Sequence, residues 1–115
     1  DGCMAVAKML EFLATQETKL SEVIASLPPY FVSSRKVSCD WALKGTVMRR
    51  LNEQFEGQTI DRTDGLKVYL GKEWVLILPD PDRPIFHVIA EGTSNTSADA
   101  LVQKYVRIVE SLQQQ

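Results

Sequence analysis

The stretch WVLILPDPDRPIFHVIAEG, residues 74–92, decides the fold of this chain. Hydrophobic residues dominate both of its ends, residues 74–78 and 85–92, as in two strands of one sheet. The residues between them, in LPDPDRP, include three prolines, two aspartates and one arginine. Proline fixes the backbone φ angle and aspartate accepts hydrogen bonds from nearby amides, so both favour turns. We therefore predict two strands joined by a stiff loop.

Further segments complete the predicted sheet and its cover. Residues 30–39 are predicted to be extended, and residues 66–78 are predicted to form a hairpin that turns at GKE. Helices are predicted over residues 41–55 and 97–112, where apolar residues recur three or four positions apart. From residue 30 the order is strand, helix, strand, strand, strand, helix. This order predicts an α+β fold with a four-stranded antiparallel sheet and two helices on one face.

The helix over residues 41–55 has a start and a stop in the sequence. Asp40 is placed to cap it, because its carboxylate can accept the free amide protons of the first turn. Gly57 is placed to end it. The stripe predicted to face the core is Leu43, Val47, Leu51 and Phe55.

The first 28 residues do not fit that unit. Residues 2–15 carry apolar side chains at helical spacing, and a short second helix is predicted before Pro28 and Pro29. The chain does not begin with methionine, so we expect a fragment of a longer protein. We divide it into residues 1–28, the end of a preceding domain, and residues 29–115, a separate C-terminal domain.

Composition excludes several function classes. The 115 residues carry a net charge of −2, and the scattered lysines and arginines argue against nucleic acid and against a membrane surface as partners. The chain start lacks a signal peptide, so a cytoplasmic location is expected. Cys3 and Cys39, the only cysteines, are then expected to be reduced and buried thiols.

Taken together, these segments resemble the end of the alpha-D-phosphohexomutase superfamily, the phosphoglucomutases and phosphomannomutases. The opening segment DGCMAVAKMLEFLATQETKLSEVIASLP is similar to the closing helices of that family's third domain. The segments VSCDWALKGTVMRRLNEQF, DGLKVYL and WVLILPDPDRPIFHVIAEG are similar to its fourth domain. The resemblance covers nearly the whole chain and depends on the order of elements and on the frame W-V-L…P…P…V…AEG.

The resemblance places a functional loop at LPDPDRP. In the family this loop is usually written RPSGTEP and grips the phosphate of the sugar phosphate, for which an arginine fork is well suited. Here the frame keeps both prolines but changes nearly everything else. The positions of the family's phosphate-binding loop are Leu78, Pro79, Asp80, Pro81, Asp82, Arg83 and Pro84.

The changes weaken the expected grip. Leu78 replaces the family's arginine, Asp80 and Asp82 replace its serine and threonine, Pro81 replaces its glycine, and Arg83 replaces its glutamate. A carboxylate about 4 Å from a phosphate charge costs on the order of 4 kcal/mol near a protein surface. We therefore expect weak sugar-phosphate binding or none. Alternatively, the loop is only a proline-stiffened connection.

Three hypotheses follow for the function. The leading one is a non-catalytic C-terminal domain of a bacterial mannose-1-phosphate guanylyltransferase, a nucleotidyltransferase fused to phosphomannomutase-like domains that makes GDP-mannose. The second is the phosphate-gripping domain of a working phosphomannomutase or phosphoglucomutase, with Arg83 as a replacement ligand. The third is an interaction module that forms a homo-oligomer through its sheet. In the first two, the remaining domains of the parent chain are the partners, and they supply Mg²⁺ by resemblance; no cofactor is expected in this chain.

Other candidate residues are given structural roles. His87 is an auxiliary candidate, because the family has a basic residue near this position, but no carboxylate is expected beside it. Aspartates at 61, 64, 80 and 82 match no oxygen-ligand loop, so no metal site is predicted. Trp41 and Trp74 could stack on a sugar, but core or interface packing is the preferred interpretation.

Overall fold

The structure is a computed structural model that describes residues 1–114. Two helices come first, α1 (Gly2–Gln16) and α2 (Leu20–Ser26), which we call the arm. The rest, from β1 onward, is the body. Its elements are β1 (Phe31–Ser38), α3 (Trp41–Gln54), β2 (Ile60–Asp61), β3 (Leu66–Leu70), β4 (Glu73–Pro79), β5 (Ile85–Gly92) and α4 (Asn95–Gln113).

The body confirms the α+β class, but its antiparallel sheet has five strands instead of the predicted four. Their order is β1-β5-β4-β3-β2, so β1 and β2 form the two edges. The additional strand, β2, pairs Ile60 with Val68 and Asp61 with Lys67 of β3. Two residues are too few to show the alternation that identifies a strand in a sequence, so this strand was missed.

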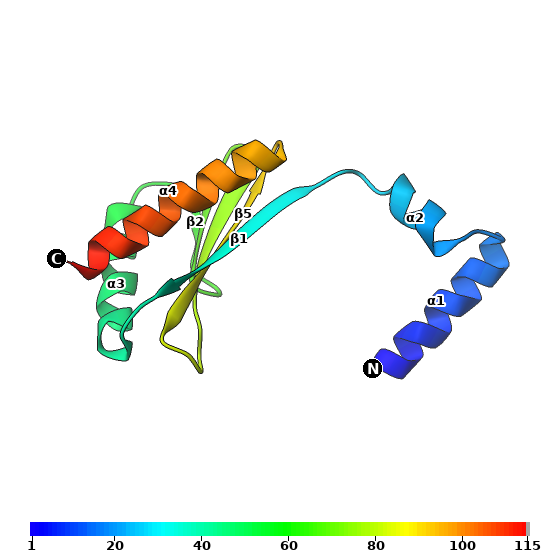
Figure 1. Cartoon of the computed structure of the whole chain (residues 1–115), viewed down its shortest axis with the longest axis horizontal. Coiled ribbons are helices and arrows are strands. Elements are labelled where there is room, and N and C mark those ends of the chain that lie inside the picture. Colours follow the sequence, from blue (N-terminus) through cyan, green and yellow to red (C-terminus); the bar gives the residue numbers. More distant parts are fainter. Residues whose placement is uncertain (115) are drawn as a thin grey trace.

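One face of the sheet carries the core. Phe86, Val88 and Ala90 of β5 are fully buried on this face, because side chains alternate between the two faces along a strand. Helices α3 and α4 cover it (Figure 1). Tyr105 of α4 stacks on Phe55 at the end of α3, with ring centroids 5.5 Å apart. The two helices thereby share one core with the sheet, whereas no helix within residues 1–114 covers the opposite face.

Helix α3 begins as predicted but turns a different side to the core. Asp40 caps it by accepting a hydrogen bond from the Ala42 amide at 3.0 Å. Val47 and Leu51 are fully buried, but Leu43 is 37% exposed and Lys44 is only 8% exposed. The buried stripe therefore starts at Lys44, and its assignment to Leu43 was wrong, because hydropathy ranks a lysine as a surface residue.

Helix α4 begins two residues earlier than predicted, at Asn95, and Ser94 caps it through the Ser97 amide. The chain reaches this helix through Gly92, at the end of β5. A methyl group at Gly92 would lie 2.5 Å from the backbone nitrogen of Ala98. Glycine is therefore needed where β5 passes close under the first turn of α4.

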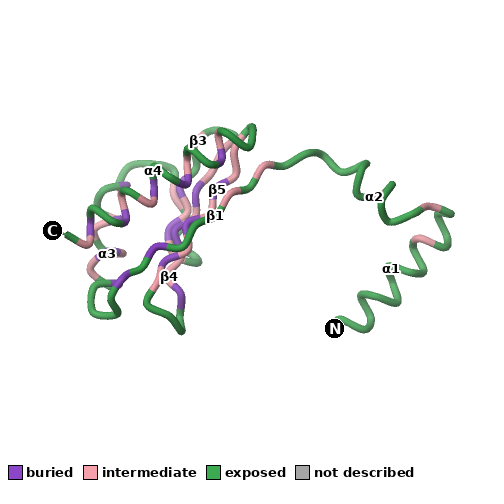
Figure 2. The backbone as a smooth tube through the Cα atoms, viewed as in Figure 1, coloured by how far each residue is buried: buried purple, intermediate pink, exposed green. Residues whose placement is uncertain are grey.

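The arm makes no core of its own. It lies well away from the body, and neither helix has a buried residue (Figures 1 and 2). The long dimension of the molecule, 58 Å against 30 and 23 Å, reflects this separation. Cys3 on α1 is exposed, which corrects the expectation that both thiols are buried; Cys39 is buried, and both are free.

Candidate functional site at the β4–β5 loop

Residues 80–84 form the loop that connects β4 and β5. It closes like a hairpin, with the Asp80 amide donating to the Ile85 carbonyl at 3.0 Å and the Ile85 amide donating to the Arg83 carbonyl at 2.8 Å. The flanking Leu78 and Pro79 belong to β4 and are half-buried, whereas Pro81, Asp82 and Pro84 are exposed. The predicted turn between the two strands is therefore present, and within residues 80–84 only Asp80 is buried.

The Asp80 carboxylate is the centre of this loop. Its side chain is 6% exposed. Oδ1 accepts from the amides of Asp82 at 3.0 Å and Arg83 at 2.9 Å. Oδ2 accepts from the Arg83 guanidinium at 2.9 and 3.2 Å and from His87 Nε2 at 2.7 Å. These donors favour the ionised form, and the His87 hydrogen bond lowers the pKa of Asp80 most.

His87 has the carboxylate partner that the sequence did not predict. It lies on β5 opposite Leu78 of β4, and the hairpin brings Asp80 against its ring. An ionised carboxylate only accepts hydrogen bonds, so Nε2 carries the proton in this contact. The Nδ1 atom is then the ring nitrogen that remains for another partner. His87 is therefore oriented by Asp80, and the view that no carboxylate lies beside it was wrong.

Arg83 is the one cation within residues 80–84. Its Nε and Nη2 atoms face Asp80, yet 58% of the side chain remains exposed. A guanidinium has five N–H groups in a planar fork. Two of them bind Asp80, and the other three have no acceptor within residues 1–114. Arg83 can therefore offer donors to an anion while Asp80 holds it in place.

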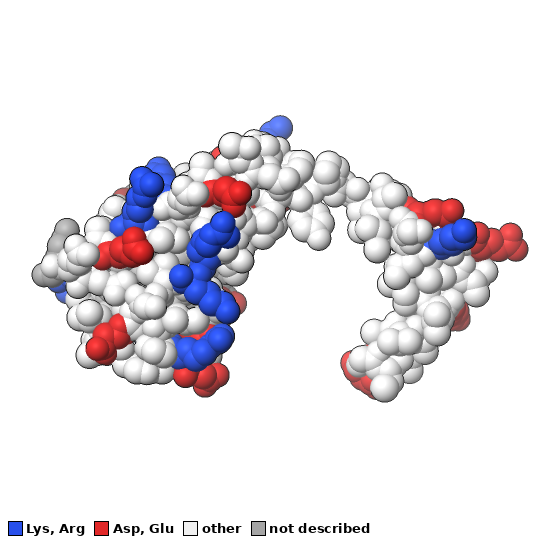
Figure 3. All heavy atoms as spheres, viewed as in Figure 1, with Lys and Arg blue, Asp and Glu red and all other residues white. Residues whose placement is uncertain are grey.

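A row of residues crosses the open face of the sheet beside the loop. The register aligns Leu78 of β4 with His87 of β5, and His87 with Lys36 of β1. The position that the resemblance assigns to an arginine is thus apolar, but a basic residue stands on each of the next two strands. In the space-filling view, basic side chains form a column over the region of β1 (Figure 3).

Lys44 is a site residue that sequence reasoning missed. Its Nζ donates to the carbonyl of Asp80 at 2.5 Å and to the carbonyl of Arg83. It also lies 3.9 Å from the ring centroid of Trp41, which is half exposed rather than packed in the core. The only signal in the sequence was the spacing of Lys44 with Val47 and Leu51 along one face of α3.

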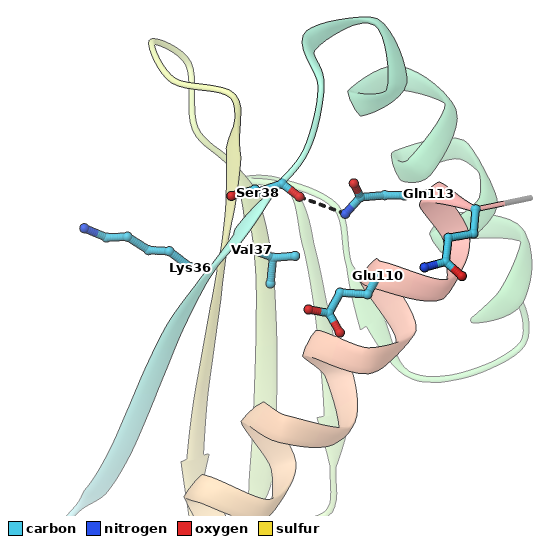
Figure 4. A pocket seen from close by; sticks show the side chains of 6 residues that line it. Lys36, Val37, Ser38, Glu110 and Gln113 are labelled. Atoms are coloured by element: carbon cyan, nitrogen blue, oxygen red, sulfur yellow. Dashed lines mark hydrogen bonds between the residues drawn. The ribbon is translucent and has the colours of Figure 1, made fainter.

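The open groove between β1 and α4 is a weaker candidate. Its volume is about 460 Å³, and its lining includes Lys36, Ser38, Glu110 and Gln113. Lys36 points away from it, and Gln113 is tied to the Ser38 carbonyl at 3.0 Å (Figure 4). This leaves one carboxylate and no paired acid, base or nucleophile in the groove, so we assign it no chemistry.

Residues 1–114 contain no group of three or more His, Cys, Asp or Glu side chains placed to hold a metal ion. Over the same residues, no helix has the length and apolar character needed to cross a membrane.

Comparison with known proteins shows what the chain is similar to. A probable phosphoglucosamine mutase of Methanopyrus kandleri is 35% identical over 95% of this chain. A phosphoglucomutase/phosphomannomutase of Thermococcus kodakarensis and a phosphoglucosamine mutase of Methanocaldococcus jannaschii are each 31% identical, over 96% and 95% of the chain. Its relatives are phosphohexomutases.

The similarity covers only part of these mutases. The chain spans 25%, 24% and 25% of the lengths of the three relatives, about a quarter of each. No protein-family model matches the sequence. The phosphohexomutase resemblance is thus supported by the relatives, whereas they give no support to a guanylyltransferase fusion.

Proposed function

We propose that this chain is the C-terminal domain of a phosphohexomutase, preceded by the last helices of its third domain, and that the β4–β5 loop contacts the phosphate of the hexose phosphate. The observation that carries the proposal is the similarity to mutases over 95% of the chain. It favours the working-mutase hypothesis over the non-catalytic guanylyltransferase tail, which we set aside.

Arg83 is the proposed phosphate ligand, with His87 beside it. A guanidinium matches the geometry of phosphate oxygens, and charge-assisted hydrogen bonds are among the strongest in proteins. Asp80 binds both side chains through Oδ2 and so holds them in one place. The pair replaces the arginine that the resemblance assigns to Leu78.

The orientation of Asp80 reduces the repulsion expected between the loop aspartates and a phosphate. Weak binding is expected only if Asp80 and Asp82 both point at the phosphate. Asp80 is turned inward and shared among the amides of Asp82 and Arg83, the Arg83 guanidinium and His87. Of the two aspartates, only Asp82 is exposed. Repulsion is therefore smaller than a count of aspartates suggests.

The remaining chemistry belongs to the rest of the parent protein in this proposal. By resemblance, the phosphorylated serine and the Mg²⁺ loop lie in earlier domains. Those domains would also cover the arm, whose apolar residues are largely exposed; Val6 and Leu10, for example, are each 62% exposed. Burying such surface is worth about 25 cal/mol per Å², which would hold the arm against its neighbours.

Isothermal titration tests the proposal on this chain. Glucosamine 6-phosphate, glucose 6-phosphate and mannose 1-phosphate are titrated into the wild type, Arg83→Ala and Arg49→Ala. Arg49 is the matched control, because it is also exposed but pairs with Glu53 on α3 at 2.7 Å. Loss of charge-assisted bonds in Arg83→Ala is expected to weaken binding roughly tenfold to a hundredfold, with Arg49→Ala unchanged. Equal binding by all three proteins, or none by the wild type, would contradict the proposal.

A further inference from the structure

Lys44 is a buried cation that the proposed phosphate contact does not use. It lies one turn into α3, and its side chain is only 8% exposed. A buried ammonium is unfavourable unless its three N–H groups find partners. Two of them bind carbonyl oxygens, those of Asp80 and Arg83, and the centroid of the Trp41 ring lies 3.9 Å from the ammonium nitrogen. Two hydrogen bonds and one cation–π contact therefore stabilise the buried ammonium.

The segment of residues 39–44, which contains Lys44, also binds a third carbonyl of the loop. The Cys39 amide donates to the Pro84 carbonyl at 2.8 Å. Three of the five carbonyls in residues 80–84 are thus bound from residues 39–44, two of them by one ammonium group. The loop is consequently fixed to the start of α3 rather than only to its own strands.

Lys44 also brings charge to the loop. Among residues 1–114 it forms no ion pair, and both of its hydrogen-bond partners are neutral carbonyls. The Asp80 carboxylate is engaged by Arg83 and His87 instead. The ammonium charge is therefore not cancelled by a paired carboxylate, and it lies directly against the loop backbone, where it favours an anion.

We propose that Lys44 is a positioning residue for phosphate binding: it fixes the β4–β5 loop through the Asp80 and Arg83 carbonyls and supplies positive charge beneath it, without touching the ligand. Trp41 shields one side of the ammonium from water. The affinity consequence rests on the proposed function of the loop, whereas the positioning itself is a property of the ligand-free chain.

The first experiment needs no ligand. Backbone NMR spectra of the full 115-residue chain are compared for the wild type, Lys44→Met and Lys104→Met, a control that removes an exposed lysine from α4. Lys44→Met is expected to shift the amide signals of Asp82 and Arg83 and to raise the pKa of the Asp80 carboxyl towards its ordinary value, because contact with His87 and these amides loosens. Unchanged loop signals and an unchanged Asp80 pKa would overturn the proposal, whatever the chain binds.

The second experiment separates charge from anchoring. Lys44→Arg keeps the charge and donors, whereas Lys44→Gln keeps only a neutral donor. In titrations with glucosamine 6-phosphate, Lys44→Met and Lys44→Gln are expected to bind about tenfold more weakly than the wild type, and Lys44→Arg within about threefold. If Lys44→Gln binds as tightly as the wild type, the proposed role of the positive charge is wrong. If Lys44→Met does so, the whole proposal is overturned.

A milder substitution covers the case in which Lys44→Met does not fold. Trp41→Leu leaves both carbonyl bonds of Lys44 but removes the ring from one side of the ammonium. Exposure to water screens the charge, so this variant is expected to keep its loop amide signals and to bind the phosphate about threefold more weakly. Loss of the loop signals in Trp41→Leu, or wild-type affinity in this variant, would contradict the shielding role.

Discussion

The arm and the body have similar helical patterns but different surroundings. Helix α1 has apolar residues at helical spacing, as α4 does, yet α1 has no buried residue while α4 buries Val102, Tyr105 and Val109 almost completely. The difference is the partner surface, because α4 packs on the sheet, whereas α1 lies away from the sheet and has no buried residue. A hydrophobic stripe predicts a helix, but only its neighbours decide how much that stripe stabilises the fold.

Leucine truncations should show the largest contrast between the two regions. Leu51 of α3 is fully buried, so Leu51→Ala is expected to lower the free energy of unfolding by about 2–5 kcal/mol through lost burial and a cavity. Leu10 of α1 is 62% exposed, and Leu10→Ala should change it by at most about 0.5 kcal/mol. Urea unfolding followed by circular dichroism measures both. A similar loss in the two variants would break the distinction between arm and body.

A pair of glycine substitutions tests close packing in the same way. Gly92→Ala places a methyl group 2.5 Å from the Ala98 backbone nitrogen, so overpacking is expected to cost about 1–3 kcal/mol. Gly2 of α1 has nothing within 4 Å of the corresponding position. Gly2→Ala should therefore leave the unfolding free energy of the body unchanged. Thermal unfolding of the two variants makes the comparison, and a tolerated Gly92→Ala would mean that β5 and α4 lie further apart.

Acid should lower the free energy of unfolding of the body, because Asp80 becomes protonated. Its pKa is lowered in the folded chain, chiefly by the His87 hydrogen bond, so the unfolded chain takes up the proton first as the pH falls. The stabilisation is present above the ordinary aspartate pKa of about 3.9 and is lost as the pH drops from there towards the lower folded value. The free energy of unfolding, measured between about pH 2 and 7, should change less with pH for Asp80→Asn than for Asp82→Asn. Asp82→Asn is the control, because it changes an exposed residue. Matching pH dependences would show that Asp80 is not held as described.

The reactivities of the two cysteine thiols should differ between the arm and the body. Cys3 is exposed on the arm, whereas Cys39 is buried in the body and burial raises its pKa. The thiolate is the reactive form. A thiol reagent at neutral pH is therefore expected to modify one thiol quickly, and mass spectrometry should locate the label on Cys3. Equal labelling of Cys39 in the folded chain would mean that the β1–α3 connection opens readily.

Local patterns in the sequence were sufficient to predict most helices and strands of the body. Runs of hydrophobic residues predicted β4 and β5, Asp40 predicted the start of α3, and the prolines and aspartates predicted the loop. The two-residue β2 could not be predicted, because its identity depends on pairing with β3 rather than on its own residues.

The chemistry of the loop depended on contacts that local patterns do not contain. Asp80 meets His87 because the hairpin register places β5 beside the turn, and neither residue type signals that contact. Lys44 is buried because its ammonium reaches two carbonyls 36 and 39 residues away in sequence. Scales of hydrophobicity assign lysine to the surface, so a buried and satisfied lysine is missed by them.

The central claim, that this chain completes a phosphohexomutase, is tested most directly with the whole parent protein. The complete gene product would be assayed for transfer of the phosphate between the 1- and 6-positions of glucosamine, glucose and mannose, alongside its Arg83→Ala variant. We expect mutase activity on at least one of these sugars and a KM raised about tenfold or more in the variant. Absence of mutase activity, with GDP-mannose formed from GTP and mannose 1-phosphate instead, would contradict the account.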